Sequence, residues 1–207
     1  KRHLNQRSEM LSGISHDLRT PLTRIKLQLS MIKDKNISEK MSQDVIEMEK
    51  MLNEYLQFAS SSSIEKTETF NFSELLTLTI DKYENENIST KIQDMIYFDG
   101  RKSLIQRCLN NVIDNAIKFG KLINISLKKD KNNIYIKIDD DGPGIDEKEL
   151  ENVFKPFYKI DKGRDISKSS VGLGLSIASD IIKSHGGKIN LTRSSPNGLS
   201  VEIILPF

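Results

Sequence analysis

The sequence predicts two domains of different fold class: an all-α antiparallel helical hairpin that forms a dimeric four-helix bundle, followed by an α+β sandwich. Apolar residues in the first part recur at heptad spacing, whereas the second part alternates amphipathic helices with strands of period two. Between these patterns lies a polar, serine-rich run, residues 60–67, which is typical of a linker. We therefore expect domains at residues 1–62 and 70–207, with a linker at 63–69.

The first domain is expected to consist of two helices joined by a turn around residues 35–38. Apolar residues of the first helix form two lines along one face: Leu4, Leu11, Leu18, Ile25 and Ile32, accompanied by Ile14, Leu22 and Leu29. Those of the second helix repeat at spacings of four and three: Met41, Val45, Met48, Leu52, Tyr55 and Ala59. Two helices cannot enclose a core between themselves, so a four-helix bundle with a second copy is expected. A hairpin packed on the rest of the chain is the alternative.

The second domain should place its helices on one face of a mainly antiparallel sheet. Helices are expected at residues 74–83, with Ser73 as the cap, at 102–119 and from 174 to 183. The helix at 102–119 carries four apolar residues on one face: Ile105, Leu109, Val112 and Ala116. Strands are expected at 92–98, 123–127, 134–138, 188–192 and 199–205, with turns at 131–133 and 196–198.

Composition excludes several classes of function. The 207 residues carry 31 Lys+Arg against 29 Asp+Glu, a formal charge of +2, so we expect no nucleic-acid partner, which would require a basic patch. The single cysteine, Cys108, cannot form an intrachain disulfide. No run approaches the roughly 18 consecutive apolar residues of a membrane-spanning helix. Because the chain begins without Met, in what looks like a polar helix, we expect a soluble fragment of a longer protein.

His16 lies outside the heptad seam, near the middle of the solvent face of the first helix. Thr20 follows one turn later on the same face, and Asp17 is adjacent. Pro21 falls in the helix interior, where it should kink or loosen the helix beside His16. A neutral imidazole has a lone pair at pH 7, and a carboxylate that holds the other ring N–H makes it a better nucleophile. An exposed histidine alone is most often just solvated.

Three motifs of the second domain suit a nucleotide. The helix at 102–119 puts Asn111, Asn115 and Lys118 on one side, where carboxamides and an ammonium suit hydrated Mg²⁺ and phosphate oxygens. The strand at 134–138 leads into Asp140, Gly142 and Gly144, so the backbone can approach a flat ligand while the carboxylate accepts from an exocyclic amine. Glycines of the run Gly172, Leu173, Gly174 open the next helix, where N–H groups could meet phosphates. Each motif alone is common without a ligand, and the P-loop, Rossmann and serine/threonine kinase motifs are absent from the sequence.

Residues 15–25, SHDLRTPLTRI, closely resemble the phospho-acceptor box of sensor histidine kinases in the HisKA-type dimerisation and histidine phosphotransfer domain, the osmosensing subgroup in particular. In their order and spacing, the three later motifs are similar to the N, G1 and G2 boxes of the Bergerat-type ATPase domain, which histidine kinases share with type II topoisomerases, Hsp90 chaperones and MutL. Residues 154–157, FKPF, look like the kinase F box.

The resemblance implies a role for each matched residue. His16 would be the phosphorylated nucleophile, Asp17 its base or orienting group, and Thr20 would help remove phosphate from the partner protein. Asn115 would bind Mg²⁺, and the rest of the site would contact ATP: Asn111 and Lys118 at the phosphates, Phe119 and Asp140 at the adenine, with Gly142, Gly144, Ile145, Gly172, Leu173 and Gly174. Residues 158–171 would form the ATP lid, in which Ser170 stands where the family usually has glycine.

These assignments predict a homodimeric histidine kinase that takes ATP with Mg²⁺, phosphorylates itself and passes the phosphoryl group to an aspartate on the receiver domain of a response regulator. Phosphatase activity toward that regulator is also expected. The resemblance implies the cytoplasmic part of an inner-membrane sensor, connected to the membrane only through missing upstream segments. Two alternatives stay open: an ATP-driven conformational clamp or chaperone with the same nucleotide fold, and a catalytically silent dimerisation module.

Overall fold

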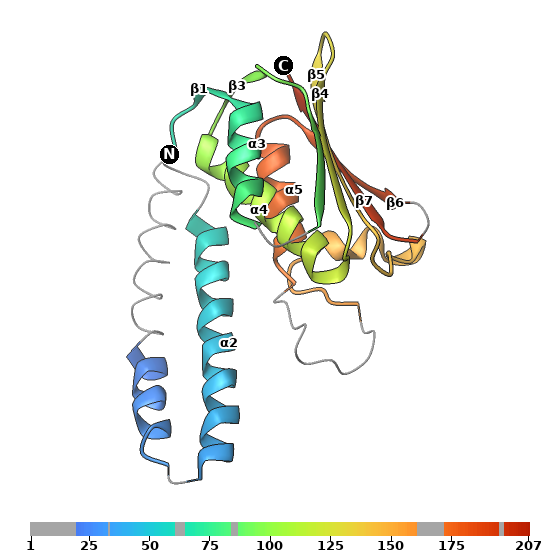
Figure 1. Cartoon of the computed structure of the whole chain (residues 1–207). Coiled ribbons are helices and arrows are strands. Elements are labelled where there is room, and N and C mark those ends of the chain that lie inside the picture. The colour runs from blue at the N-terminus through green and yellow to red at the C-terminus, as the bar shows by residue number, and fades with distance from the viewer. Residues whose placement is uncertain (1–19, 33, 61–64, 84–86, 161–171, 195–196) are drawn as a thin grey trace. The chain divides into compact units, whose positions relative to one another are not determined.

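The computed structural model describes residues 20–32, 34–60, 65–83, 87–160, 172–194 and 197–207; within it, the side chains of residues 47, 50, 51 and 53–60 are not described. The chain divides into two compact units, Lys1–Glu65 and Lys66–Phe207 (Figure 1). In the part of the chain that is described, no helix combines the length and apolar character needed to cross a membrane.

In the first unit, residues 20–29 are helical and α2 spans Lys35–Ser60. The expected turn at residues 35–38 is wrong, because these residues form the first turn of α2. Asp34 explains the difference: its Oδ1 accepts hydrogen bonds from the backbone N–H of Asn36 (3.0 Å) and Ile37 (3.2 Å), which are otherwise unpaired at a helix start. The chain therefore turns earlier than expected.

The heptad seam is only partly buried within one chain. Leu29 and Val45 have 3% and 5% of their surface exposed, and the Ser38 hydroxyl donates to the Leu29 carbonyl between the two helices. Leu22 and Leu52 are half-buried, and four other described seam residues are exposed: Ile25, Ile32, Met41 and Met48. Leu4, Leu11, Ile14 and Leu18 lie outside the described residues. A row of exposed apolar side chains is typical of a surface that packs against another apolar surface.

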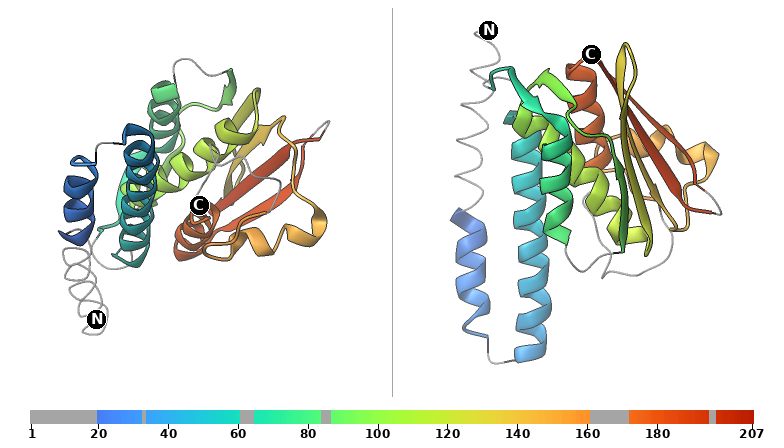
Figure 2. Two further views of the ribbon diagram at one scale, coloured as in Figure 1. Left: turned by 90° about the horizontal axis from the view of Figure 1, so that it is seen from below. Right: turned by 45° about the horizontal axis from the view of Figure 1, so that its top comes forward.

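The second unit has the expected α+β architecture, with helices α3, α4 and α5 on one face of a five-stranded sheet (Figures 1 and 2). The sheet order is β2-β4-β5-β7-β6, and only the β2–β4 pair is parallel. The helices are α3 Phe72–Ile80, α4 Lys102–Phe119 and α5 Gly174–Ser184, with 3-10 turns η1 Asp81–Tyr83, η2 Glu147–Glu149 and η3 Asn152–Phe154. The strands are β2 Ile88–Ile92, β4 Ile123–Lys129, β5 Asn133–Asp140, β6 Lys188–Arg193 and β7 Leu199–Pro206, and β1 Glu68–Asn71 pairs separately with β3 Tyr97–Gly100.

Two local expectations for this unit are wrong. The single strand expected at residues 92–98 is wrong, because β2 ends at Ile92 and β3, in a different sheet, begins only at Tyr97. Met95, in the segment between them, has a left-handed backbone (φ 57°) that does not fit an extended strand. The cap of α3 is Asn71, whose Oδ1 accepts from the Glu74 N–H at 3.2 Å. Ser73 instead donates to the Gln93 carbonyl and accepts from the Ile96 N–H, so it anchors the segment that contains Met95.

The core lies between the sheet and the helices. Alternate residues of β4 and β5 are buried, α4 packs against β5, and the four apolar residues predicted on α4 are all buried. In β5 the inward residues are Ile134, Ile136 and Ile138, each at most 1% exposed. Asp140 continues this alternation. The strand pattern therefore carries a carboxylate to the edge of an apolar core.

Candidate functional site

The three predicted nucleotide motifs come together around the C-terminal half of α4. A Cβ placed on Gly174, at the start of α5, would lie 3.8 Å from the Asn111 carbonyl oxygen. A Cβ on Gly142, just after β5, would lie 2.9 Å from the Phe119 carbonyl oxygen. Segments that are distant in the sequence therefore approach α4 closely at glycines.

Asp140 is the buried acid of this site. It has 7% of its surface exposed, and its Oδ1 accepts hydrogen bonds from the backbone N–H of Gly142 (2.8 Å) and Leu199 (3.2 Å). Burial raises the pKa of its carboxyl group, against these two donors, which lower it. Both hydrogen bonds that the carboxyl group accepts from described residues reach Oδ1, so Oδ2 is the carboxyl oxygen that remains for a ligand amine.

The β6–β7 turn holds Asp140 in place, a role that the sequence analysis missed. The Ser194 hydroxyl donates to the Asp140 carbonyl, and a Cβ on Gly198 would lie 1.7 Å from that same oxygen. Gly144 has φ +63°, and a Cβ there would lie 2.5 Å from the Asn197 carbonyl oxygen. The only signal in the sequence was the Asn-Gly pair, which indicates a turn but not what the turn packs against.

The α4 side of the site has a polar group without a partner. Asn111 Nδ2 is buried and has no hydrogen-bond partner among the described residues. Such a buried donor costs about 1–3 kcal/mol unless a ligand satisfies it, and a phosphate oxygen would do so. One turn further along, Asn115 is half-buried, and Lys118 Nζ lies 5.4 Å from the ring centroid of the exposed Phe119.

These residues also fit a magnesium ion. The carboxamide oxygens of Asn111 and Asn115 are hard donors of the kind that Mg²⁺ prefers, and the ion commonly keeps waters and substrate phosphates as its other ligands. No group of three or more His, Cys, Asp or Glu able to hold a metal occurs within the described ranges. The carboxamide oxygens of Asn111 and Asn115 are therefore the donors that this side of α4 offers to such an ion.

The two ends of the expected lid meet beside α5. The backbone N–H of Phe157 donates to the Gly172 carbonyl (2.9 Å), and both residues have left-handed backbones, φ 64° and 79°. A Cβ on Gly172 would lie 2.6 Å from the Tyr158 carbonyl oxygen, so the junction requires glycine. Leu173 is 1% exposed, so its side chain anchors α5 in the core. Residues 161–171, with Ser170, lie outside the described residues.

The structure describes only the last residues of the phospho-acceptor motif. His16 and Asp17 lie outside the described residues. Thr20 is the first described residue, helical and exposed, and Pro21 follows it within the same helix. Ile145 is half-buried, one residue beyond Gly144.

Two family models match the chain. "Histidine kinase-, DNA gyrase B-, and HSP90-like ATPase" matches residues 100–207, and "His Kinase A (phospho-acceptor) domain" matches residues 6–64.

Among curated relatives, sensor histidine kinase GtrS of Pseudomonas aeruginosa is 33% identical over 99% of this chain and 43% of its own length. Sensor histidine kinase CpxA of Escherichia coli is 28% identical over 100% of this chain and 48% of its own length. The chain thus spans less than half of either relative.

Solved structures show the same fold. Full-length ShkA in complex with AMPPNP has a TM-score of 0.76 at 18% identity, over 97% of this chain and 46% of that one. The catalytic domain of the histidine kinase ThkA has a TM-score of 0.57 at 27% identity, over 68% of this chain and 95% of that one.

Proposed function

Because the chain belongs to the family of histidine kinase-, DNA gyrase B- and HSP90-like ATPases, we propose that it phosphorylates His16 from Mg-ATP. The chain joins this ATPase domain to a histidine kinase phospho-acceptor domain. The phosphoryl group then passes to an aspartate on the receiver domain of a response regulator. The observation that carries the proposal is that the segment of Asp140 and the start of α5 both pack against α4, Gly142 at Phe119 and Gly174 at Asn111, on a chain that also contains the SHDLRTP motif.

Each part of the site has a role in this reaction. Asp140 Oδ2 accepts a hydrogen bond from the adenine amine, while the N–H groups of Gly142 and Leu199 hold Oδ1 in place. Phe119 packs on the base. Asn111 and Lys118 bind phosphate oxygens, and the N–H groups that open α5 add a partial positive charge there. Asn115 holds Mg²⁺, which, when bound, neutralises phosphate charge.

The transfer is a displacement at the γ-phosphorus. A ring nitrogen of His16 donates its lone pair to phosphorus, the bond from phosphorus to the bridging oxygen breaks, and ADP leaves with that electron pair. Asp17 orients the other ring nitrogen and stabilises the positive charge that develops on the imidazole. Catalysis here is mainly positioning and charge neutralisation, so the γ-phosphate has to be brought close to His16. We propose that the linker at residues 63–69 lets the ATPase domain move to do this.

The exposed apolar seam supports a homodimer. Ile25, Met41 and Met48 are largely exposed in the single chain, and a second copy of the hairpin would cover them in a four-helix bundle. We place the dimerisation and phosphotransfer domain at residues 1–62 and the ATP-binding domain at 70–207. Because the chain spans less than half of its curated relatives, we assign sensing and attachment to an inner membrane to segments upstream of this cytoplasmic part.

Incubation with ATP labelled at the γ-phosphate should give a protein label that is stable to alkali and labile to acid. His16→Ala should reduce this label to background, because no other group takes the phosphoryl in this scheme. His3→Ala, which removes a second histidine of the same region, should leave it unchanged.

Label that survives His16→Ala would contradict the kinase assignment. ATP hydrolysis without any histidine label would instead favour a clamp or chaperone, and absence of nucleotide binding would favour a silent dimerisation module.

Phosphatase activity toward the phosphorylated regulator is the second proposed activity, and it is supported by Thr20, which is exposed and follows His16 by four positions in the sequence. Thr20→Ala should slow decay of the phospho-regulator at least about tenfold, because the hydroxyl that positions the attacking water is lost. Autophosphorylation should stay within about twofold. Thr23→Ala, an exposed threonine of the same helix, is the matched control, and equal slowing by both variants would refute a specific role for Thr20.

A further inference from the structure

The turn that links α4 to β4 is held by Asp141, which lies between Asp140 and Gly142 and has no role in the nucleotide site proposed above. The chain leaves α4 at Gly120 in an extended conformation, and the Gly120 N–H donates to the Ala116 carbonyl at 2.7 Å. The next two backbone N–H groups, of Lys121 and Leu122, both donate to Asp141 Oδ1, at 2.6 and 2.9 Å. Asp141, the first residue after β5, thus ties this turn to the end of β5.

Close backbone packing makes this connection sensitive to position. A Cβ on Gly120 would lie 2.8 Å from Asp140 Cβ and 3.1 Å from Asp141 Oδ1. A Cβ on Gly142 would lie 2.7 Å from Asp140 Oδ1 and 2.9 Å from the Phe119 carbonyl oxygen. A shift of the turn would therefore displace Phe119 and Asp140 relative to each other.

We propose, resting on the function proposed above, that Asp141 is a positioning residue for the nucleotide base. It holds the turn at residues 120–122 so that the Phe119 ring and the Asp140 carboxylate contact the same base. Asp141 acts through the turn rather than by touching the base. The N–H groups of Leu122 and Lys121 lower the pKa of its carboxyl group, so the acceptor stays ionised at neutral pH and both bonds are charge-assisted.

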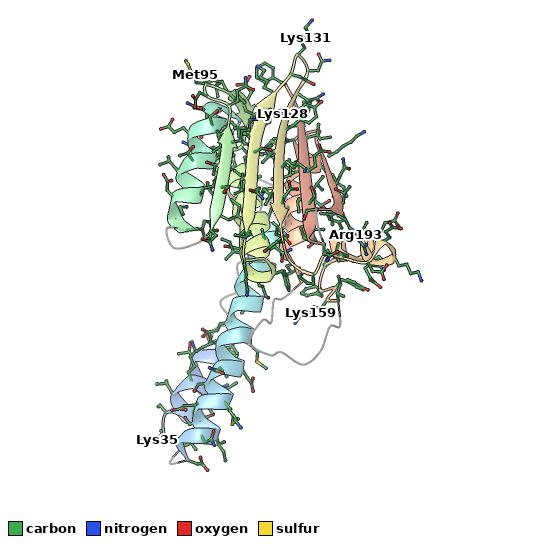
Figure 3. All side chains as sticks on the ribbon, turned by 45° about the vertical axis from the view of Figure 1, so that its right-hand side comes forward. Lys35, Met95, Lys128, Lys131, Lys159 and Arg193 are labelled. Carbon is green, nitrogen blue, oxygen red and sulfur yellow. The ribbon has the colours of Figure 1, made fainter. Side chains whose placement is uncertain are left out.

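The chain contains a matched aspartate away from the site. Asp130, in the β4–β5 turn, accepts from the backbone N–H of Asn132 (2.8 Å) and Asn133 (2.7 Å) through its Oδ1, and these bonds lower the pKa of its carboxyl group too. Its neighbour Lys131 lies at the tip of this hairpin, and Arg193 lies at the opposite end of the sheet (Figure 3). Strand β5 reaches Asp140 at the end where Arg193 lies. The two aspartates share a local chemistry and differ in location.

The test compares Asp141→Ala, Asp141→Asn and Asp130→Ala in the full chain, by calorimetric titration with ADP and by urea unfolding. Asp141→Ala removes both hydrogen bonds to the turn and should weaken ADP binding about tenfold. Asp141→Asn keeps an acceptor oxygen and should stay within about threefold of wild type. Asp130→Ala should bind ADP like wild type, although its urea midpoint should fall about as far as that of Asp141→Ala.

Autophosphorylation provides a readout that loss of stability alone would not move. For Asp141→Ala the KM for ATP should rise about tenfold while kcat at saturating ATP stays within about twofold. Wild-type ADP affinity in Asp141→Ala, or an equal loss in Asp130→Ala, would overturn the inference and leave the proposed function standing. Failure of the wild-type chain to bind ADP would overturn the proposed function itself and this inference with it.

Discussion

Asp140→Asn should weaken ADP binding about a hundredfold while leaving the second unit at least as stable as wild type. The asparagine Oδ1 can still accept from the Gly142 and Leu199 N–H groups, which places the Nδ2 donor where the carboxylate offered an acceptor. The Nδ2 group then faces the adenine amine, and because both groups are hydrogen-bond donors, no hydrogen bond forms between them. A hundredfold loss corresponds to about 2.7 kcal/mol, the scale of an unmet hydrogen bond to a charged group.

The direction of the stability effect follows from the raised pKa of Asp140, whose main cause is burial. The folded chain binds the proton of the Asp140 carboxyl group more tightly than the unfolded chain does. The contribution of Asp140 to the free energy of unfolding therefore falls as the pH rises from 3.8, its ordinary pKa, through its raised pKa in the folded chain. At neutral pH the buried charge is a cost, and the asparagine removes it. Urea unfolding at pH 7 measures this effect, and calorimetry measures ADP binding.

Asp139→Asn is the matched control for this substitution. Asp139 is the neighbouring residue of β5, has the opposite side-chain direction, and pairs with Lys137 Nζ at 2.8 Å. Its replacement should leave ADP affinity unchanged. If Asp140→Asn bound ADP within about threefold of wild type, Asp140 would not be the base-reading acid.

Gly198→Ala should lower the free energy of unfolding of the second unit by more than about 3 kcal/mol and abolish ADP binding. The added Cβ would lie 1.7 Å from the Asp140 carbonyl oxygen and 2.5 Å from its carbonyl carbon, and backbone atoms cannot rotate away. The β6–β7 turn must then move, which breaks the hydrogen bond from the Leu199 N–H to Asp140 Oδ1. Urea unfolding followed by circular dichroism, with ADP titration, measures both effects.

Gly174→Ala provides the contrast for stability. Its Cβ would meet the nearest atom, the Asn111 carbonyl oxygen, at 3.8 Å, which is an ordinary contact. Since alanine also favours a helix over glycine, we expect a change in unfolding free energy within about 1 kcal/mol. A Gly198→Ala midpoint equal to that of Gly174→Ala would show that the β6–β7 turn can move without cost.

Long periodic elements were predictable, and short ones that depend on remote partners were not. Helix α4 has the bounds expected for it, and the strands of the β4–β5 hairpin follow the expected alternation, because many residues repeat the same pattern. The strand expected at residues 92–98 is wrong because β2 ends at Ile92 and β3 begins in another sheet at Tyr97, with the left-handed Met95 between them. The turn expected at residues 35–38 is wrong because the Asp34 carboxylate caps α2, which therefore begins at Lys35.

The sequence alone determined the residue chemistry of this protein: a histidine outside a heptad seam, carboxamides along one side of a helix, and an aspartate followed by glycines. These features depend on spacing along one element, which a periodic pattern reveals. Only the tertiary structure decided what holds Asp140 in place, namely the Leu199 N–H, the Ser194 hydroxyl and the backbone at Gly198. It also decided that Asp141 ties the end of α4 to β5. These contacts join backbone groups far apart in the chain, and every residue type carries such groups, so no side-chain pattern announces them.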